Sequence, residues 1–233
     1  WLGKPAIIKD AEIEAIRDFL NAHSNVQLEK VSLSINDAVK ANGVLVMFSC
    51  NTCPYVIKNQ QRTLDIAAYA KQNNKPLHLL GLVSDGGVHS HTSHLKAICD
   101  VCKTKGLSAV YIHAFTDGRD TDPKSGLDFI EDLENHLKNS AGKIATVSGR
   151  YYAMDRDKRW ERVQLAYDTL VKAEGPRASA AMDVLKANYA GNITDEFIKP
   201  TVLTENGAAI ATIKDGDAVL CFNFRTDRCR EIT

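Results

Sequence analysis

The chain has 233 residues, of which 44% are hydrophobic and 25% are charged, values that are ordinary for a globular protein with a buried core. Lys and Arg together number 29, as do Asp and Glu, so the formal net charge is zero and favours neither nucleic acid nor an anionic membrane as a partner. The sequence has no run of 18 apolar residues that could cross a membrane, and its first residues are too charged to read as a secretory signal.

The first predicted element is a short apolar strand that precedes a thiol motif. Within residues 43–63, the strand is followed by Cys50-x-x-Cys53-Pro54 and a helix-like stretch. This order is typical of a thiol–disulfide centre, because a helix N-terminus lowers the pKa of the first thiol, and it resembles the motif region of thioredoxin-like proteins. A complete domain of that kind takes about 100 residues or more. We therefore expect residues 1–63 to form an atypical N-terminal segment with a partial redox motif, or a strand, turn and helix without a redox role.

From residue 64 onward, apolar strands alternate with amphipathic helices. The predicted strands are residues 77–83, 109–115, 143–149 and 218–224. The predicted helices are residues 64–72, 93–106, 123–140, 158–175 and 179–192. This alternation predicts an α/β domain over residues 64–233, in which a mostly parallel sheet carries helices on both faces as a three-layer sandwich.

A loop that combines Gly or Asp with His or Arg follows each of these four strands. The loops read SDGGVHSH, TDGRD, SGRYYAMDRD and RTDR. Any one of them is explained as a solvated turn, but four together are less easily explained by chance. Because ligands of parallel sheets bind beyond the carboxyl ends of the strands, the sequence predicts one shared binding site there.

The side chains in these loops suit an anionic ligand. Arg donates two parallel hydrogen bonds to phosphate or carboxylate, and the loops supply Arg119, Arg150, Arg156, Arg225 and Arg228. Five guanidinium groups exceed the needs of one phosphate and fit a small ligand that carries a phosphate and a carboxylate. His89 follows two glycines and can bind a phosphate or shuttle a proton. Asp120, with Arg119 beside it, can accept a proton from a hydroxyl.

Other residues in the loops and helices have simpler explanations. His89, His91 and His94 have a spacing that permits a metal site, but no nearby Glu completes a hydrolytic zinc helix. We therefore expect His91 and His94 to cap or line the following helix, and we expect no bound metal. Asp85 and Asp117 are expected to form turns. Cys99 and Cys102 are expected to be buried thiols of a helix. Six cysteines in this length do not indicate a disulfide scaffold, so a cytoplasmic location is expected.

Long motifs in the same loops resemble those of the cofactor-independent (2,3-bisphosphoglycerate-independent) phosphoglycerate mutases. They include TDGRDT, GRYYAMDRDKRW and KDGDAVLCFNFRTDRCREIT, and the resemblance runs in order over residues 64–233. It implies an isomerase of glycolysis and gluconeogenesis that interconverts 3-phosphoglycerate and 2-phosphoglycerate. It also implies two domains. A phosphatase-type domain carries a nucleophilic Ser and two manganese ions, and a phosphotransferase domain holds the glycerate.

The resemblance also implies roles for individual residues. By motif, the substrate-binding residues are His89, Arg119, Asp120, Arg150, Arg156, Arg225 and Arg228. Asp120 matches the residue that exchanges protons with the glycerate hydroxyls. The nucleophilic Ser and the metal ligands do not appear in this sequence. We therefore expect the chain to be a fragment that supplies the substrate-binding domain, with the phosphatase-type domain as its partner, and to be inactive alone. The alternatives are a binding module without catalysis and a thiol–disulfide oxidoreductase that uses Cys50 and Cys53.

Overall fold

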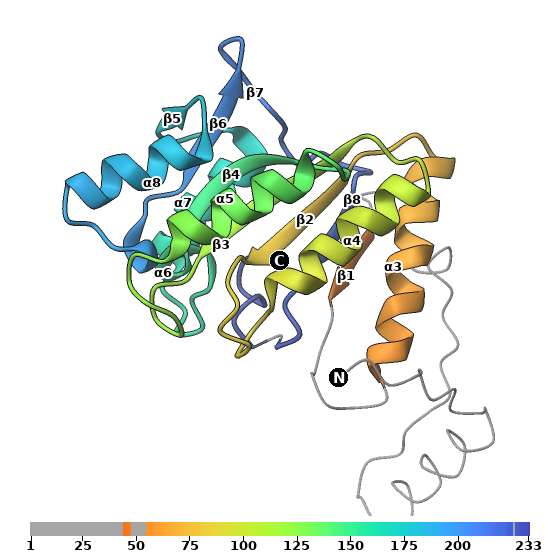
Figure 1. Ribbon diagram of the computed structural model, residues 1–233, viewed down its shortest axis with the longest axis horizontal. Helices are drawn as coiled ribbons and strands as arrows, with labels where there is room; N and C mark the ends of the chain where they lie inside the picture. Colours follow the sequence, from red (N-terminus) through yellow and green to blue (C-terminus); the bar gives the residue numbers. More distant parts are fainter. Residues whose placement is uncertain (1–43, 48–54, 226) are drawn as a thin grey trace, which may run out of the picture.

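The computed structural model describes residues 44–47, 55–225 and 227–233. The strands are β1 (Val44–Met47), β2 (Leu77–Leu82), β3 (Val110–Thr116), β4 (Lys143–Gly149), β5 (Arg177–Ala178), β6 (Thr201–Glu205), β7 (Ala208–Ala209) and β8 (Ala218–Cys221). The helices are α3 (Tyr55–Gln72), α4 (Thr92–Thr104), α5 (Gly126–Leu137), α6 (Arg150–Ala153), α7 (Trp160–Lys172), α8 (Ala181–Ala190) and the 3-10 helix η1 (Asp195–Phe197). Figure 1 shows how the helices surround one twisted sheet.

The sheet is mostly parallel, which confirms the predicted α/β class. Its strand order is β1-β8-β2-β3-β4-β6-β5, and β7 pairs with β6 at the side. The four strands predicted after residue 64 correspond to β2, β3, β4 and β8, and the strand predicted within residues 43–63 corresponds to β1. The sequence pattern missed the short strands β5, β6 and β7, and β6 runs antiparallel to β4. The predicted strand 218–224 ends early, at Cys221. The backbone N–H of Phe222 still donates to the carbonyl of Leu80 in β2 (3.0 Å), but that of Phe224 donates to the carbonyl of His89, in the loop after β2 (2.8 Å).

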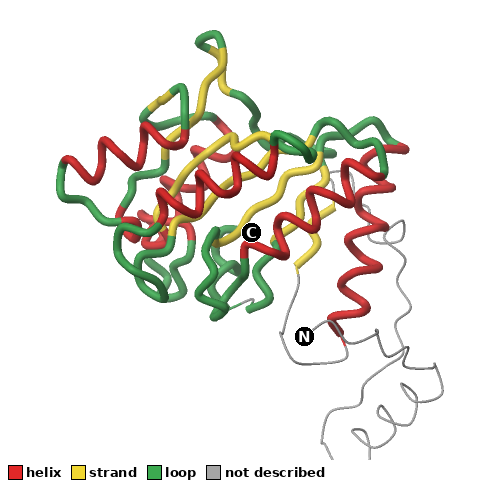
Figure 2. Tube along the Cα trace, viewed as in Figure 1, coloured by secondary structure: helices red, strands yellow, loops and turns green. Residues whose placement is uncertain are grey.

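Two buried clusters cover the two faces of the sheet, as the alternation of side chains along each strand requires. Figure 2 shows the strands of this sheet with the helices packed around them. Leu77 and Leu79 of β2 lie in the cluster that includes residues of α3, α4, α5 and α8. Leu80 and Leu82 lie in the opposite cluster, with residues of α6, α7 and the C-terminal turn. The helices therefore lie on both faces, as predicted.

The region before residue 64 also contributes to this sheet. β1 pairs in parallel with β8, in a register that places Val44 opposite Ala218, and α3 continues through residue 63. The division of the chain into segments 1–63 and 64–233 stays a prediction. Cys50 and Cys53, on which the redox interpretation depends, lie outside the described residues.

Candidate functional site

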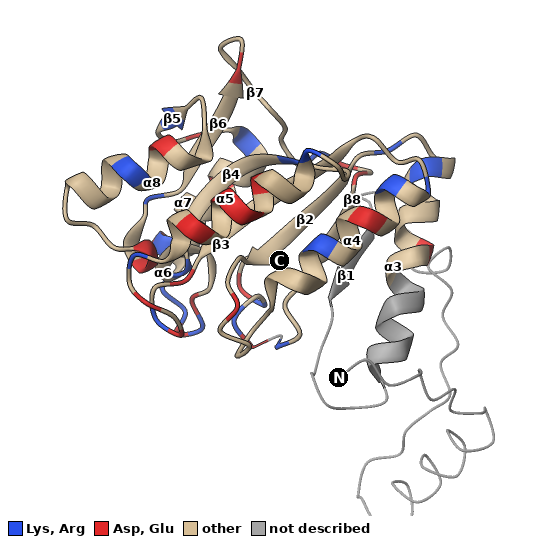
Figure 3. Ribbon diagram, in the orientation of Figure 1, with Lys and Arg blue, Asp and Glu red and all other residues tan. Residues whose placement is uncertain are grey.

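The parallel strands bring the four predicted loops to one edge of the sheet. β8, β2, β3 and β4 are neighbours that run in the same direction, so the loops that follow them leave the sheet at the same side. Figure 3 marks acidic and basic residues side by side in these loops. The prediction that the loops converge is therefore met by the fold, and their side chains form the candidate site.

Arg150 is the buried centre of this site. It is the first residue of α6, directly after β4, and only 4% of it is exposed. Its Nη1 donates to Asp117 Oδ1 (2.6 Å) and to Asp120 Oδ2 (2.5 Å). Burial opposes the guanidinium charge, but the two carboxylates outweigh it and raise the pKa of Arg150. A cation fixed in this way has little freedom to move when a ligand binds.

Asp117 forms the predicted turn and also holds Arg150, a role that the sequence did not reveal. Its Oδ1 accepts from the backbone N–H groups of Arg119 (3.2 Å) and Asp120 (3.0 Å), as expected of a turn-forming Asp. Its Oδ2 accepts from the hydroxyl of Ser84 (2.7 Å). Burial favours the neutral carboxyl, but these hydrogen bonds and Arg150 hold the pKa of Asp117 below its ordinary value. The loops after β2, β3 and β4 are thus tied together by one carboxylate.

Arg119 lies beside Asp120 in sequence, but its guanidinium group turns to a different carboxylate. Its Nη1 is 3.4 Å from Glu196 Oε1 of η1, and 57% of its side chain is exposed. The cation that contacts Asp120 is therefore Arg150, and Arg119 keeps an exposed guanidinium group at the rim of the site. Glu196 lies 77 positions from Arg119 in the sequence, so no local pattern predicted this pair.

His89 lies between two carboxylates on opposite sides of its ring. Its Nε2 is 3.8 Å from Asp120 Oδ2, and its Nδ1 is 4.0 Å from Asp227 Oδ1. Burial and the nearby charges of Arg150 and Arg225 lower the pKa of His89 to about 4, and the two carboxylates only partly oppose this shift. The imidazole is therefore neutral at neutral pH.

Asp227 joins two of the predicted arginines and was not singled out from the sequence. Its Oδ2 accepts from Arg156 Nη1 (3.1 Å) and from Arg225 Nη2 (3.1 Å). Burial raises the pKa of Asp227, but Arg225, Arg156 and His89 together hold it below the ordinary value. The sequence signal was available, because this Asp lies inside the RTDR loop between two of the chosen arginines.

Arg228 completes the cluster of cations. Its Nη1 donates to the carbonyl of Met154 (3.5 Å). Burial lowers the pKa of Arg228, and the nearby charges of Arg156, Arg150 and Arg119 lower it further. Four of the five predicted arginines pair with carboxylates of the site, which keep these like charges close together. A cluster of guanidinium groups is the arrangement expected of a site for a ligand with more than one negative charge. All seven predicted site residues therefore lie in one region.

Asp195 fixes the loop that carries Arg119 and Asp120. This carboxylate is fully buried and accepts from the backbone N–H of Gly126 (2.7 Å) and from the hydroxyl of Tyr189. The backbone carbonyl of Asp195 accepts from Thr116 Oγ1 at the end of β3 (2.7 Å). Gly118 lies between these contacts with a φ of +66°, and a Cβ there would approach Asp195 Cβ to 2.9 Å. Only glycine suits this position of the loop.

The structure supports the simpler explanation of the histidines after β2. His91 caps α4, because its ring accepts from the backbone N–H of Ser93 (3.2 Å), and the His94 ring packs edge-on against Phe224. In the part of the chain that the structure describes, no group of three or more His, Cys, Asp or Glu side chains could hold a metal ion. The described residues therefore offer no site for the two manganese ions that the family resemblance implies. No helix among them is long and apolar enough to span a membrane.

Cys99 and Cys102 are buried on α4, as predicted. Burial raises the pKa of Cys102 to about 12 and also raises that of Cys99. We expect neither thiol to react with iodoacetamide near neutral pH while the chain is folded, and both to react in urea. Peptide mass spectrometry after alkylation measures this. Modification of either cysteine in the folded chain as fast as in the unfolded chain contradicts the burial.

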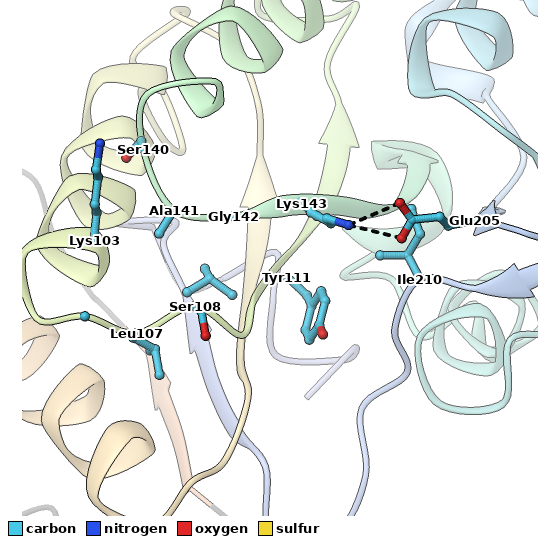
Figure 4. A pocket seen from close by; sticks show the side chains of 12 residues that line it. Lys103, Leu107, Ser108, Tyr111, Ser140, Ala141, Gly142, Lys143, Glu205 and Ile210 are labelled. Atoms are coloured by element: carbon cyan, nitrogen blue, oxygen red, sulfur yellow. Dashed lines mark hydrogen bonds and ion pairs between the residues drawn. The ribbon is translucent and has the colours of Figure 1, made fainter.

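A cavity of about 500 Å³ lies at the opposite edge of the sheet and contains none of the predicted site residues. Figure 4 shows Tyr111 and Lys143, at the start of β3 and β4, on its wall. The ammonium of Lys143 pairs with Glu205 (3.0 Å), and that of Lys103 donates to the carbonyl of Asn139 (2.6 Å). Both lysines of this wall are thus engaged. We place the candidate site at the carboxyl edge because the arginines converge there.

Comparison with known proteins is informative over the same part of the chain. The family model described as BPG-independent PGAM N-terminus (iPGM_N) matches residues 55–233. A 2,3-bisphosphoglycerate-independent phosphoglycerate mutase of Parabacteroides distasonis is 58% identical over 166 residues, which cover 71% of this chain and 33% of that protein. The protein of the same name from Clostridium perfringens is 59% identical over 165 residues, which cover 70% of this chain and 32% of that protein.

A solved structure has the same fold. The Leishmania mexicana phosphoglycerate mutase, crystallised at low cobalt concentration, matches with a TM-score of 0.69 and 31% sequence identity over 76% of this chain and 35% of that one. The chain thus spans about a third of the length of the relatives that it matches.

Proposed function

This chain belongs to the family of BPG-independent phosphoglycerate mutases, whose N-terminal part it matches, and we propose that it binds 3-phosphoglycerate and 2-phosphoglycerate as the substrate-binding part of such an enzyme. The complete enzyme interconverts the two acids in glycolysis and gluconeogenesis. The supporting observation is the convergence of Arg119, Arg150, Arg156, Arg225 and Arg228 around His89 at one edge of the sheet. A phosphorylated three-carbon acid carries a phosphate and a carboxylate and can pair with several of these cations at once.

The arginines of the site differ in how freely their side chains can move, which suggests that they bind the ligand in different ways. Arg150 is held by two carboxylates and serves as a fixed positive charge at the floor of the site. Arg119, Arg156 and Arg225 are each about half exposed and can turn from their carboxylate partners to a ligand. Asp120 then lies beside the fixed Arg150, where it exchanges a proton with a glycerate hydroxyl as the catalytic acid and base.

The phosphoryl chemistry itself belongs, in this proposal, to a phosphatase-type domain. That domain supplies the nucleophilic Ser and two manganese ions, which stabilise the charge of the transferred phosphoryl group. This chain alone then binds the substrate without turnover. We place the protein in the cytoplasm, and the unpaired state of Cys99, Cys102, Cys221 and Cys229 supports a reducing compartment.

The thiol–disulfide oxidoreductase alternative receives no support. The relatives described above are phosphoglycerate mutases, and the family match begins at residue 55, after the Cys50-x-x-Cys53 motif. The motif itself lies outside the described residues.

Calorimetric titration of the chain with 3-phosphoglycerate tests the proposed binding. We expect Arg225→Ala and Arg119→Ala each to weaken binding by about tenfold or more, because each removes a charge-assisted hydrogen bond worth about 1.5–3 kcal/mol. Arg177→Ala is the matched control, since Arg177 is exposed on β5, away from the site, and we expect it to leave the affinity unchanged. Absence of binding, or binding that neither site variant weakens, contradicts the assignment.

A further inference from the structure

Two buried polar atoms at the centre of the site face each other without a partner. His89 Nδ1 and Asp227 Oδ1 are 4.0 Å apart, and neither atom has a hydrogen-bond partner among the described residues. A buried polar atom without a partner is costly, and each such atom calls for an explanation. The nitrogen can donate and the oxygen can only accept, so a hydrogen bond from His89 Nδ1 to Asp227 Oδ1 would satisfy both atoms.

The other ring nitrogen of His89, Nε2, faces a carboxylate that already has a hydrogen-bond donor. This nitrogen is 3.8 Å from Asp120 Oδ2, but that oxygen already accepts a charge-assisted hydrogen bond from Arg150 Nη1 (2.5 Å). Asp227 Oδ1 has no such donor within the described residues. A neutral imidazole carries a single N–H. Placing it on Nδ1, toward Asp227, supplies the oxygen that lacks a donor, whereas placing it on Nε2 sets two acceptors against each other at Nδ1.

In the ligand-free chain, Arg156 and Arg225 orient the Asp227 carboxylate from its other side. Arg156 and Arg225 both donate to Oδ2 at 3.1 Å, which leaves Oδ1 directed to His89. The two loops are also joined by the backbone, because the N–H of Phe224 donates to the carbonyl of His89 (2.8 Å). A shift of about 1 Å brings Nδ1 and Oδ1 to the distance of an ordinary hydrogen bond.

We propose that Asp227 is a positioning residue that holds His89 as the tautomer protonated at Nδ1, so that Nε2 offers its lone pair to a hydroxyl of the bound ligand. This inference rests on the proposed function, because it names how the hydroxylated acid is recognised. His89 then acts as a neutral acceptor for the hydroxyl and leaves the negative groups of the ligand to the arginines. A carboxylate that orients the far nitrogen of an imidazole is a general means of selecting its tautomer.

Nitrogen NMR of the isotopically labelled, ligand-free chain tests the tautomer directly. We expect His89 Nδ1 to give the signal of a protonated nitrogen and Nε2 that of a bare nitrogen, with His89→Gln assigning both signals. Asp227→Asn is expected to reverse this pattern. Its amide oxygen is drawn to the donors Arg156 and Arg225, so its NH2 group faces Nδ1 and makes that nitrogen an acceptor.

A matched control tests whether the reversed His89 signals depend on Asp227 in particular, and not on the loss of any carboxylate. Asp132→Asn changes an exposed carboxylate of α5 that pairs with Lys96, and it is expected to leave the His89 signals unchanged. A wild-type chain protonated at Nε2, or an Asp227→Asn chain with the wild-type pattern, overturns the proposal.

A pair of ligands tests the role of Nε2. 3-Phosphoglycerate is expected to shift the Nε2 signal, whereas 3-phosphooxypropanoate, which lacks the hydroxyl, is expected to bind without that shift. Equal shifts with both ligands, or no shift with either bound ligand, overturn the hydroxyl contact. If neither ligand binds, the proposed function fails, and the tautomer of the ligand-free chain still decides the role of Asp227.

Discussion

Replacing Arg150 by alanine is expected to destabilise the folded chain by about 3–5 kcal/mol and to abolish binding of 3-phosphoglycerate. The buried guanidinium group pairs with Asp117 and Asp120 at 2.6 and 2.5 Å. Removing one member of a buried ion pair leaves charge without compensation, and that loss has about this magnitude. Urea unfolding measures the change in the free energy of unfolding, and calorimetry measures binding.

Arg119→Ala is the control for this first substitution. The Arg119 side chain is 57% exposed, and its guanidinium group pairs with Glu196 at 3.4 Å. The removal of this side chain is therefore expected to change the free energy of unfolding by less than about 1 kcal/mol. Adding Asp117→Asn to Arg150→Ala removes one of the two carboxylate charges that have lost their partner. The double variant is therefore expected to recover part of the lost stability. Equal stability of the Arg150→Ala and Arg119→Ala chains would show that the buried pairs contribute little.

Replacing Gly149 by alanine is expected to destabilise the chain by about 3 kcal/mol or more, as overpacking of a rigid site does. A Cβ at this position falls against the carbonyl oxygen of Glu196 and within 2.7 Å of Ile198 N. Both contacts are backbone atoms, and the N–H of Gly149 also donates to the Ile198 carbonyl (2.7 Å), so the two segments cannot separate without losing that bond. Arg150 follows directly, so ligand binding is expected to weaken as well.

Gly191→Ala offers the matched comparison for this second substitution. Gly191 has a φ of −82°, and its added Cβ meets nothing closer than 3.4 Å. The same change of residue is therefore expected to alter stability by about 0.5 kcal/mol or less. Thermal or urea unfolding of both variants, measured side by side, separates the crowding at Gly149 from a general effect of replacing glycine. Similar midpoints for the two variants contradict the close approach of η1 to β4.

Local pattern predicted the elements that carry the site. The strands β2, β3, β4 and β8 have continuous apolar segments, and the helices between them have apolar faces, so both kinds of element follow from side-chain spacing alone. The short strands β5 and β7 contain two residues each and leave no periodic signal. Their pairing, and the antiparallel direction of β6, depend on partners far along the chain.

Residue types and their spacing were enough to predict the α/β class, the four loops after the strands, and the set of Arg, His and Asp side chains placed there. These properties depend on residue type and near neighbours. Which of these charges form pairs became clear only from the folded chain. It joined Arg119 to Glu196, Arg150 to Asp117, and Arg156 to Asp227. Each pair spans at least 33 positions of the chain, and such pairs form only when the strands between them are in register.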